Sequence, residues 1–259
     1  MAAEATVVGV VSKDAVVAPQ LSLAERVRRM QDELDISEDM VQDLLKVAGC
    51  DIYVVADDSG SMNCVAGGRE TRWDELRGTL QRLAKMLLVV DHSDGFSLKF
   101  LNDATVYTVK VADDVDAAFR GRQPRGATPL LANCAPVLDG TFHPKETDVL
   151  LLVFTDGVPS DGTFTDLQQA VQAKRPHVFV GFMMCTDEDD VVDNYNTWLD
   201  KIPGVDVNDD YYSEKKEAEQ RGNTLSYYKW LAKAVLGPKL TKYDKLDDPI
   251  ARKACCVLQ

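Results

Sequence analysis

Long apolar runs alternate with amphipathic segments along the chain from residue 50 onward. The runs at 52–56, 149–154 and 178–184 are continuously apolar, which is typical of parallel strands that helices cover on both faces. The segment 96–111 differs, because its second half alternates and an Asn-Asp-Ala turn divides it. This pattern predicts a hairpin, and therefore one antiparallel edge strand on a mostly parallel sheet.

Amphipathic helices are predicted between and after the strands, at 70–90, 128–140, 165–174, 191–202 and 225–237. Gly237 and Pro238 form a typical end for the last of them. Strands and helices therefore alternate along the domain, with a further short strand and helix near its end. That order predicts the fold class α/β, with a doubly wound, mostly parallel sheet of the Rossmann-like kind.

Two short helices are predicted ahead of this domain. Ser22 and Glu25 form an S-x-x-E capping box before an amphipathic segment, and Ser37 caps the segment that follows it. Ile36 and Val41 have the spacing of a hydrophobic staple at the second helix. We expect both helices to pack on the main domain, although such helices can also bind a partner protein.

The chain divides into a flexible N-terminal tail at 1–20, a two-helix extension at 21–49, the α/β domain at 50–237 and a C-terminal tether at 238–259. The N-terminal tail has no basic start, and Lys13 and Asp14 interrupt its apolar stretch, so we do not expect a signal peptide. The alternative for this tail is an edge strand added to the main sheet.

Polar side chains directly follow two of the long apolar strands. Asp57, Ser59 and Ser61 form a D-x-S-x-S motif after the first strand, and Asp156 follows the strand "VLLLVF". Thr128 stands between them in the sequence, at the start of a predicted helix. Because open α/β sheets bind ligands at the carboxyl ends of their strands, we expect these side chains to face one point.

The predicted ligand set contains five side-chain oxygens and neither nitrogen nor sulfur. This chemistry suits a hard divalent cation, and favours Mg²⁺ or Mn²⁺ over Ca²⁺. Where the aspartates act through water, the charge of the ion is incompletely neutralised, so it would attract a carboxylate of a protein partner. The alternative is a site without metal, in which Ser61 and Thr128 only cap helix starts.

The segments "DDSGSM", "GATPL" and "FTDG", in this order on a β/α framework, resemble the metal-ion-dependent adhesion site of the von Willebrand factor type A family. This family includes the integrin inserted domains. The resemblance covers roughly residues 50 to 237, and all five motif positions match. It implies a central, mostly parallel sheet wrapped by helices, with a metal ion at its upper edge held by the five residues named above. It also implies opening or closing around the metal as a way to switch affinity.

A non-enzymatic binding module is the expected function, because no general base is clearly directed at the site. The sequence contains neither a G-x-S-x-G elbow nor a G-x-x-x-x-G-K-[ST] loop. His92, His143 and His177 lack a metal-ligand spacing. The alternative function is a metal-dependent enzyme, or an accessory subunit of an enzyme complex.

Acidic residues also follow the strand at 178–184, from Asp187 to Asp190. They could bind a second ion such as Ca²⁺, but we expect them to form the acidic first turn of a helix, where the helix dipole favours them. The net charge of the whole chain is −13, from 29 basic and 42 acidic residues. This balance argues against a nucleic-acid partner, since phosphate binding requires a basic surface.

The six cysteines form no C-x-x-C pair, so the sequence indicates neither a zinc site nor a disulfide scaffold. We expect Cys50, Cys134 and Cys185 to be reduced thiols that pack as small apolar groups. The last four residues, Cys-Val-Leu-Gln, match a C-a-a-X prenylation signal at Cys256, and the final Gln suggests a farnesyl group. Because one lipid chain anchors weakly, Cys255 is a candidate for palmitoylation. The expected localisation is cytoplasmic, on the cytosolic face of a membrane.

Overall fold

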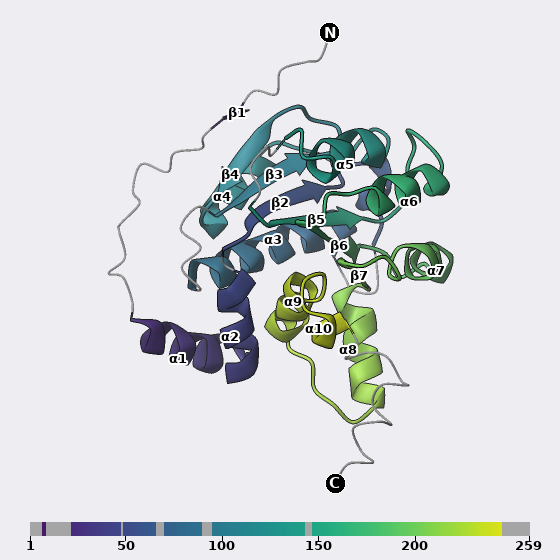
Figure 1. Ribbon diagram of the computed structural model, residues 1–259. Coiled ribbons are helices and arrows are strands. Elements are labelled where there is room, and N and C mark those ends of the chain that lie inside the picture. The colour runs from purple at the N-terminus through teal and green to yellow at the C-terminus, as the bar shows by residue number, and fades with distance from the viewer. Residues whose placement is uncertain are drawn as a thin grey trace.

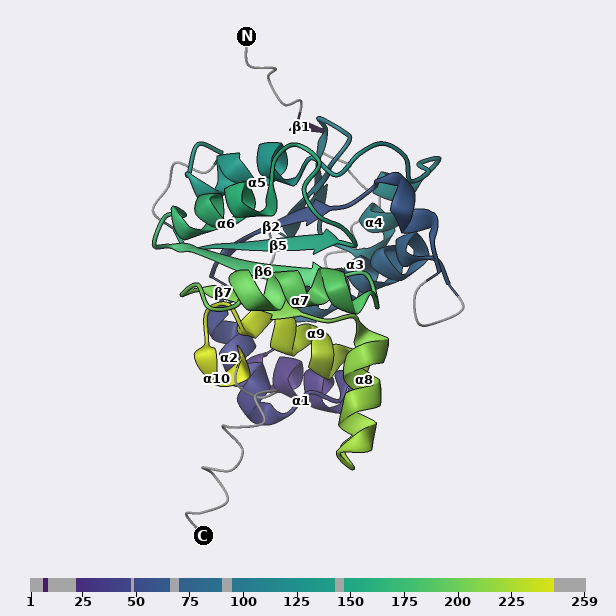
Figure 2. The ribbon, with the colours of Figure 1, turned by 90° about the vertical axis from the view of Figure 1, so that its right-hand side faces the viewer.

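A computed structural model describes residues 7–8, 22–47, 49–65, 70–89, 95–142 and 147–244. They form a seven-stranded sheet in the order β1-β4-β3-β2-β5-β6-β7, with helices on both faces (Figure 1, Figure 2). The strands are β1 Val7–Val8, β2 Asp51–Ala56, β3 Phe96–Phe100, β4 Val106–Val109, β5 Val149–Thr155, β6 Val178–Met184 and β7 Val205–Asn208.

Ten α-helices and one short 3₁₀ helix occur among the described residues. The first half of the chain contains α1 Leu23–Leu34, α2 Glu38–Val47, the 3₁₀ helix η1 Gly60–Asn63, α3 Arg72–Val89 and α4 Ala112–Phe119. The second half contains α5 Leu130–Leu138, α6 Phe164–Gln172, α7 Asp189–Trp198, α8 Tyr211–Gln220, α9 Tyr227–Leu236 and α10 Thr241–Asp244.

The predicted fold class is confirmed, because β2, β3, β5, β6 and β7 are parallel and β4 pairs antiparallel with β3. The sheet does not end at β4, however. Val7 and Val8 form β1, which pairs in parallel with β4 at the outer edge. The predicted hairpin is therefore correct, and the alternative of an added edge strand holds for these two residues. The other residues of 1–20 lie outside the described part of the chain.

The buried central strands explain why their sequences are continuously apolar. Along β2, Ile52 and Val54 belong to the core under α3 and α9, whereas Tyr53 and Val55 belong to the core under α5 and α6. Successive side chains of a strand point to opposite faces, so a strand between two helical layers needs apolar residues at every position. Figure 1 shows these two layers above and below the sheet.

The two N-terminal helices pack on the main domain, as expected. The backbone N–H of Glu25 donates to Ser22 Oγ at 3.3 Å, and the N–H of Ser22 donates to Glu25 Oε2 at 2.9 Å, which completes the predicted capping box. Ile36 and Val41 are buried in the same core as Trp230 of α9. Burial of these apolar side chains attaches the helices to the domain.

The predicted helix ranges do not include η1, α4 or α10. The shortest of these are η1 and α10. Each has four residues, which is too few to produce a helical hydrophobic period. The C-terminal end of α9 agrees with the prediction, because the helix ends at Leu236 and Gly237 follows it. In the described residues, no helix combines the length and the apolar character needed to cross a lipid bilayer.

The order of the strands creates a switch point between β2 and β5. From β2 the chain passes through α3 to β3 on one side, whereas β5 lies on the other side and is reached through α5 on the opposite face. Loops that leave two such strands diverge, and the crevice between them is the usual ligand site of an open α/β sheet. The D-x-S-x-S segment and the Thr-Asp-Gly segment follow these two strands.

Gly237→Ala is expected to lower the free energy of unfolding by about 1–3 kcal/mol, measured by urea unfolding. A Cβ atom at Gly237 would lie 2.0 Å from Oδ2 of the buried Asp206, so the carboxylate or the helix must shift. Gly49→Ala is the matched control, since a Cβ there meets no heavy atom of the described residues within 4 Å. Equal losses in the two variants would contradict this explanation.

Candidate metal site

Asp57 is fully buried at the carboxyl end of β2, and both of its carboxylate oxygens accept hydrogen bonds. The backbone N–H of Ser59 donates to Oδ1 at 2.8 Å, and Thr155 Oγ1 donates to Oδ2 at 2.7 Å. Thr155 is the last residue of β5. The Asp57 carboxylate therefore joins the ends of the two strands that flank the switch point.

The hydroxyl groups of the motif lead from this buried carboxylate to Asp156. Ser59 Oγ lies 3.0 Å from Ser61 Oγ, and Ser61 Oγ donates to Asp156 Oδ1 at 2.8 Å. Ser59 and Asp156 are buried, whereas Ser61 is exposed. These oxygens thus form a continuous series that reaches the surface.

Thr128 lies beside the residue that follows Asp156. A Cβ built on Gly157 would lie 4.0 Å from Thr128 Oγ1, which is the nearest neighbouring heavy atom. The backbone N–H of Thr128 donates to Ser160 Oγ, and its carbonyl accepts from the Ser160 N–H, both at 2.9 Å. The Gly157 carbonyl in turn accepts from the buried Tyr195 hydroxyl of α7 at 2.8 Å. The structure therefore brings all five residues predicted from the sequence to one edge of the sheet.

Asp58 attaches the loop that carries Thr128 to the D-x-S-x-S loop. Its Oδ1 accepts from the backbone and side-chain nitrogens of Asn102, both at 2.9 Å, and its Oδ2 accepts from Arg122 Nη1 at 3.3 Å. Its carbonyl accepts from the Arg125 N–H at 2.7 Å. The sequence alone does not indicate this role of Asp58, because a second aspartate after a strand has no distinct signal.

Arg72, the first residue of α3, contacts the candidate site from the side. Its side chain is 5% exposed, and its Nη1 donates to Asp156 Oδ2 at 2.8 Å. Its Nη2 donates to Glu188 Oε1 at 2.8 Å. Burial alone would lower the pKa of Arg72, but the hydrogen bonds to Glu188 and Asp156 raise it.

Arg72 is likewise absent from the predicted site residues, although its position in the sequence carries a signal. Arg72 stands in helical register with Leu76, Leu80 and Leu83, which are the buried face of α3. A charged residue at an apolar position of an amphipathic helix is rarely buried without a partner. Its position thus indicates a buried carboxylate nearby, but the sequence does not identify Asp156 as that carboxylate.

The oxygen spacing fits a small divalent cation. Neighbouring ligands of an octahedral Mg²⁺ lie about 2.8–3.0 Å apart, given metal–oxygen distances of about 2.0–2.1 Å. The Ser59–Ser61 and Ser61–Asp156 oxygen pairs, at 3.0 and 2.8 Å, have this separation. They are also normal hydrogen-bond lengths, so the same side chains hold one another in place without an ion.

Clusters of three or more His, Cys, Asp or Glu side chains suited to a metal are absent from the described residues. Only two of the five side chains in the candidate set are carboxylates, so the set is not a cluster of that type. Asp189 and Asp190 lie in the first turn of α7, which agrees with the prediction of an acidic helix start. Asp187 Oδ1 lies 3.9 Å from Arg72 Nη2.

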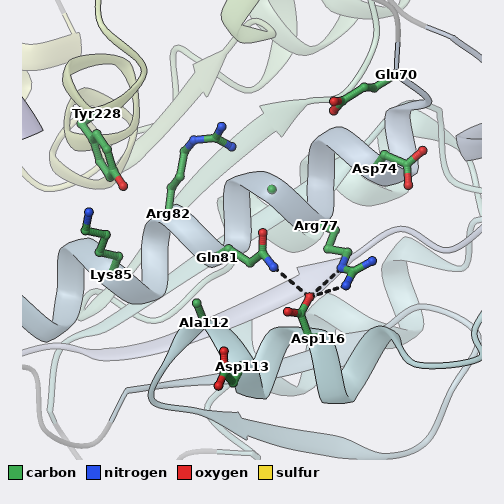
Figure 3. Close-up of a pocket in the computed structure, with 11 residues that line it drawn as sticks. Glu70, Asp74, Arg77, Gln81, Arg82, Lys85, Ala112, Asp113, Asp116 and Tyr228 are labelled. Atoms are coloured by element: carbon green, nitrogen blue, oxygen red, sulfur yellow. Dashed lines mark hydrogen bonds and ion pairs between the residues drawn. The ribbon is translucent and has the colours of Figure 1, made fainter.

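A large groove lies elsewhere, between α3 and α4 (Figure 3). It has a volume of about 800 Å³ and contains none of the five predicted residues. Its central carboxylate, Asp116, already accepts from Arg77 Nε at 2.7 Å and from Gln81 Nε2 at 2.8 Å. Asp116 and Arg77 thus neutralise each other within the groove.

The cysteine predictions concern two parts of the chain. Cys134 and Cys185 are free thiols, as expected, and so is the exposed Cys64. Cys50 is buried, and its sulfur accepts from Lys239 Nζ at 3.3 Å. Cys255 and Cys256 lie outside the described residues, so the lipidation signal stays a prediction.

No protein-family model matches the chain, and no curated protein matches it at a significant level. The assignment of a function therefore depends on the motifs, the fold and the contacts described above.

The stability of the metal-free protein is expected to depend on the protonation of Asp57. Burial raises the pKa of this carboxyl from 3.8 to about 6, although hydrogen bonds from Ser59 and Thr155 lower it in part. A raised pKa means that the contribution of this group to folding is complete below pH 4 and is lost as the pH rises through about 6.

Asp57→Asn removes this titration and provides the comparison. In the presence of a chelator, the free energy of unfolding of the wild type, relative to Asp57→Asn, is expected to fall on the order of 2–3 kcal/mol between pH 4 and pH 7. Urea unfolding at several pH values measures the difference. A difference that is constant with pH would show that Asp57 does not titrate in this range.

Proposed function

We propose that this chain is a binding module of the von Willebrand factor type A kind, without enzymatic activity. In this proposal a divalent cation at the switch point coordinates an acidic side chain of a protein partner. The observation that supports it most directly is the series of oxygens from Ser59 through Ser61 to Asp156, with the spacing of neighbouring ligands of one small cation.

The five residues have different roles in this proposal. Ser59, Ser61 and Thr128 supply neutral hydroxyl oxygens, whereas Asp57 and Asp156 supply negative charge, directly or through water. Mg²⁺ is the proposed ion, with Mn²⁺ as its substitute, because the ligand set consists of hard oxygens. When bound, the ion supplies the positive charge that attracts the carboxylate of the partner.

The proposal includes an attachment to the cytosolic face of a membrane. Its support is the C-a-a-X sequence at Cys256, with Cys255 beside it as a second acylation position. A single prenyl group binds membranes reversibly, so the second lipid would make the attachment stable.

Metal and partner binding are expected to depend on the same residues. Thr128→Ala and Asp156→Ala are each expected to weaken Mn²⁺ binding at least about tenfold, measured by calorimetric titration, because each removes one oxygen of the ligand set. Both variants are also expected to lose partners that the wild type captures from cytosol in Mg²⁺ but not in chelator.

Asp116→Ala is the matched control, since it removes a carboxylate that lies in the groove between α3 and α4 (Figure 3). It is expected to bind metal and partners as the wild type does. Partners retained equally in chelator and by Asp156→Ala would exclude a metal-bridged contact. Metal-dependent turnover of a phosphoester or peptide library would instead support the enzymatic alternative.

Cys256→Ser is expected to move the full-length protein from the membrane fraction to the cytosolic fraction of eukaryotic cells, because it removes the prenylated thiol. Cys64→Ser is the control, since Cys64 is an exposed thiol within the domain and outside the C-a-a-X signal. Unchanged partitioning of Cys256→Ser would end the proposal of a lipid anchor.

A further inference from the structure

We propose that Arg72 is a positioning residue of the candidate site, which weakens metal binding and strengthens the attraction of the bound metal for an external carboxylate. This inference rests on the proposed function, and it concerns a residue outside the D-x-S-x-S, threonine and T-D-G motifs. The proposal depends on the contacts of the Arg72 guanidinium, on its burial and on the charge of the site.

The guanidinium of Arg72 joins two loops at the carboxyl edge of the sheet. Nη1 contacts Asp156 on the loop after β5, and Nη2 contacts Glu188 on the loop after β6, both at 2.8 Å. The planar fork of arginine donates in fixed directions, and its charge does not vary at any physiological pH. Arg72 thus holds Asp156 in one orientation, and its charge is the same across the physiological pH range.

The two carboxylates that accept hydrogen bonds from Arg72 differ in their exposure to water. The side chain of Asp156 is 0% exposed and that of Arg72 is 5% exposed, whereas the side chain of Glu188 is 61% exposed. Coulomb interactions are strong between buried groups and weak where water and salt screen them. Arg72 therefore neutralises Asp156 much more effectively than Glu188 neutralises Arg72.

The charge of the buried groups follows directly from this pairing. Asp57 and Asp156 together carry two negative charges, and Arg72 carries one positive charge. A divalent cation added to these three groups leaves a net charge of +1, which one carboxylate from a partner neutralises. Without Arg72 the same cation would be neutralised by the two aspartates, and the electrostatic attraction for a further anion would be smaller.

Arg72 also limits how much of Asp156 faces the other ligands. Asp156 Oδ2 is bonded to Arg72, and only Oδ1 faces the Ser61 hydroxyl. A carboxylate held in this way offers only one oxygen to a cation. If both oxygens bound the cation, they would fill a coordination position that an outside ligand could otherwise occupy. The single free oxygen of Asp156 and the net charge of +1 thus both favour binding of an external carboxylate.

The pair has a further effect in the absence of metal. A buried carboxylate without a counter-charge is strongly destabilising, and Arg72 provides that charge to Asp156. The metal must therefore bind next to a positive charge that already neutralises Asp156. Weaker metal binding and a preassembled site are two results of the same contact.

Arg72→Met tests the proposal, because it removes the charge and replaces the apolar stem of arginine with an unbranched apolar side chain. Mn²⁺ affinity of the full-length protein is measured by electron paramagnetic resonance, and acetate affinity of the Mn²⁺-loaded protein by water-proton relaxation, at constant ionic strength. Arg72→Met is expected to raise Mn²⁺ affinity and to lower acetate affinity, each by about tenfold or more. Arg72→Lys retains the charge and is expected to restore acetate affinity to within about threefold of the wild type.

Arg77→Met is the matched control, since Arg77 lies on the same helix and pairs with Asp116 in the groove of Figure 3. It is expected to change neither affinity. Arg72→Gln is the second variant, because it loses the charge and can still donate to Asp156. If Arg72→Met and Arg72→Gln both fail to fold even in saturating Mn²⁺, the proposal is overturned, since the ion should then supply the missing counter-charge.

Opposite changes in the two affinities support the role of Arg72, because a purely structural role would weaken both. Parallel losses, or two unchanged affinities, overturn it and leave the proposed function intact if the wild type binds Mn²⁺. Absence of Mn²⁺ binding in both the wild type and Arg72→Met overturns the proposed function together with this inference.

Discussion

The burial of the Asp57 carboxylate at the end of a strand with helices on both sides constrains the rest of this edge of the sheet. A carboxylate with no contact to solvent must receive hydrogen bonds, and Asp57 receives them from Ser59 on its own loop and from Thr155 on the neighbouring strand. These bonds fix the turn after β2 and the register of β5 beside it. They also place Asp156, the residue after Thr155, within reach of the Ser61 hydroxyl.

Most contacts around this carboxylate bring together groups that are far apart in the sequence. Ser61 and Asp156 are separated by 95 residues, and Arg72 and Glu188 by 116. Contacts between the loops also hold them in place, as those of Asp58 with Asn102 and Arg122 illustrate. An edge fastened in this way is preorganised, so a ligand would not have to order it on binding.

The fold class, and the position of the five candidate residues at one edge of the sheet, could be predicted from the sequence because both depend on local patterns. Continuous apolar runs identify strands buried on both faces, and polar residues directly after them identify the carboxyl edge. The D-x-S-x-S spacing, with a threonine before a helix and an aspartate after a strand, adds a recognisable order.

The contacts of Arg72 and Asp58 could not be predicted in this way. Arg72 shows only that a charge is buried on α3, whereas its partners lie on two loops whose approach depends on the whole sheet. The apolar sequence around Val7 and Val8 is compatible with a tail or with an edge strand, and only the pairing with β4 distinguishes the two. Long-range pairing of this kind is a property of the assembled fold and is not encoded in any one segment.

The hydroxyl of Tyr195 gives α7 a mechanical connection to the edge of the sheet. This residue holds the carbonyl of Gly157, and Glu188, just before the same helix, holds Arg72. The loop after β5 is therefore joined to α7 at two points, directly at Tyr195 and through Arg72 at Glu188. A displacement of Asp156 would therefore also move α7. In the same way, a partner protein that displaces α7 from its outer face would change the position of Asp156.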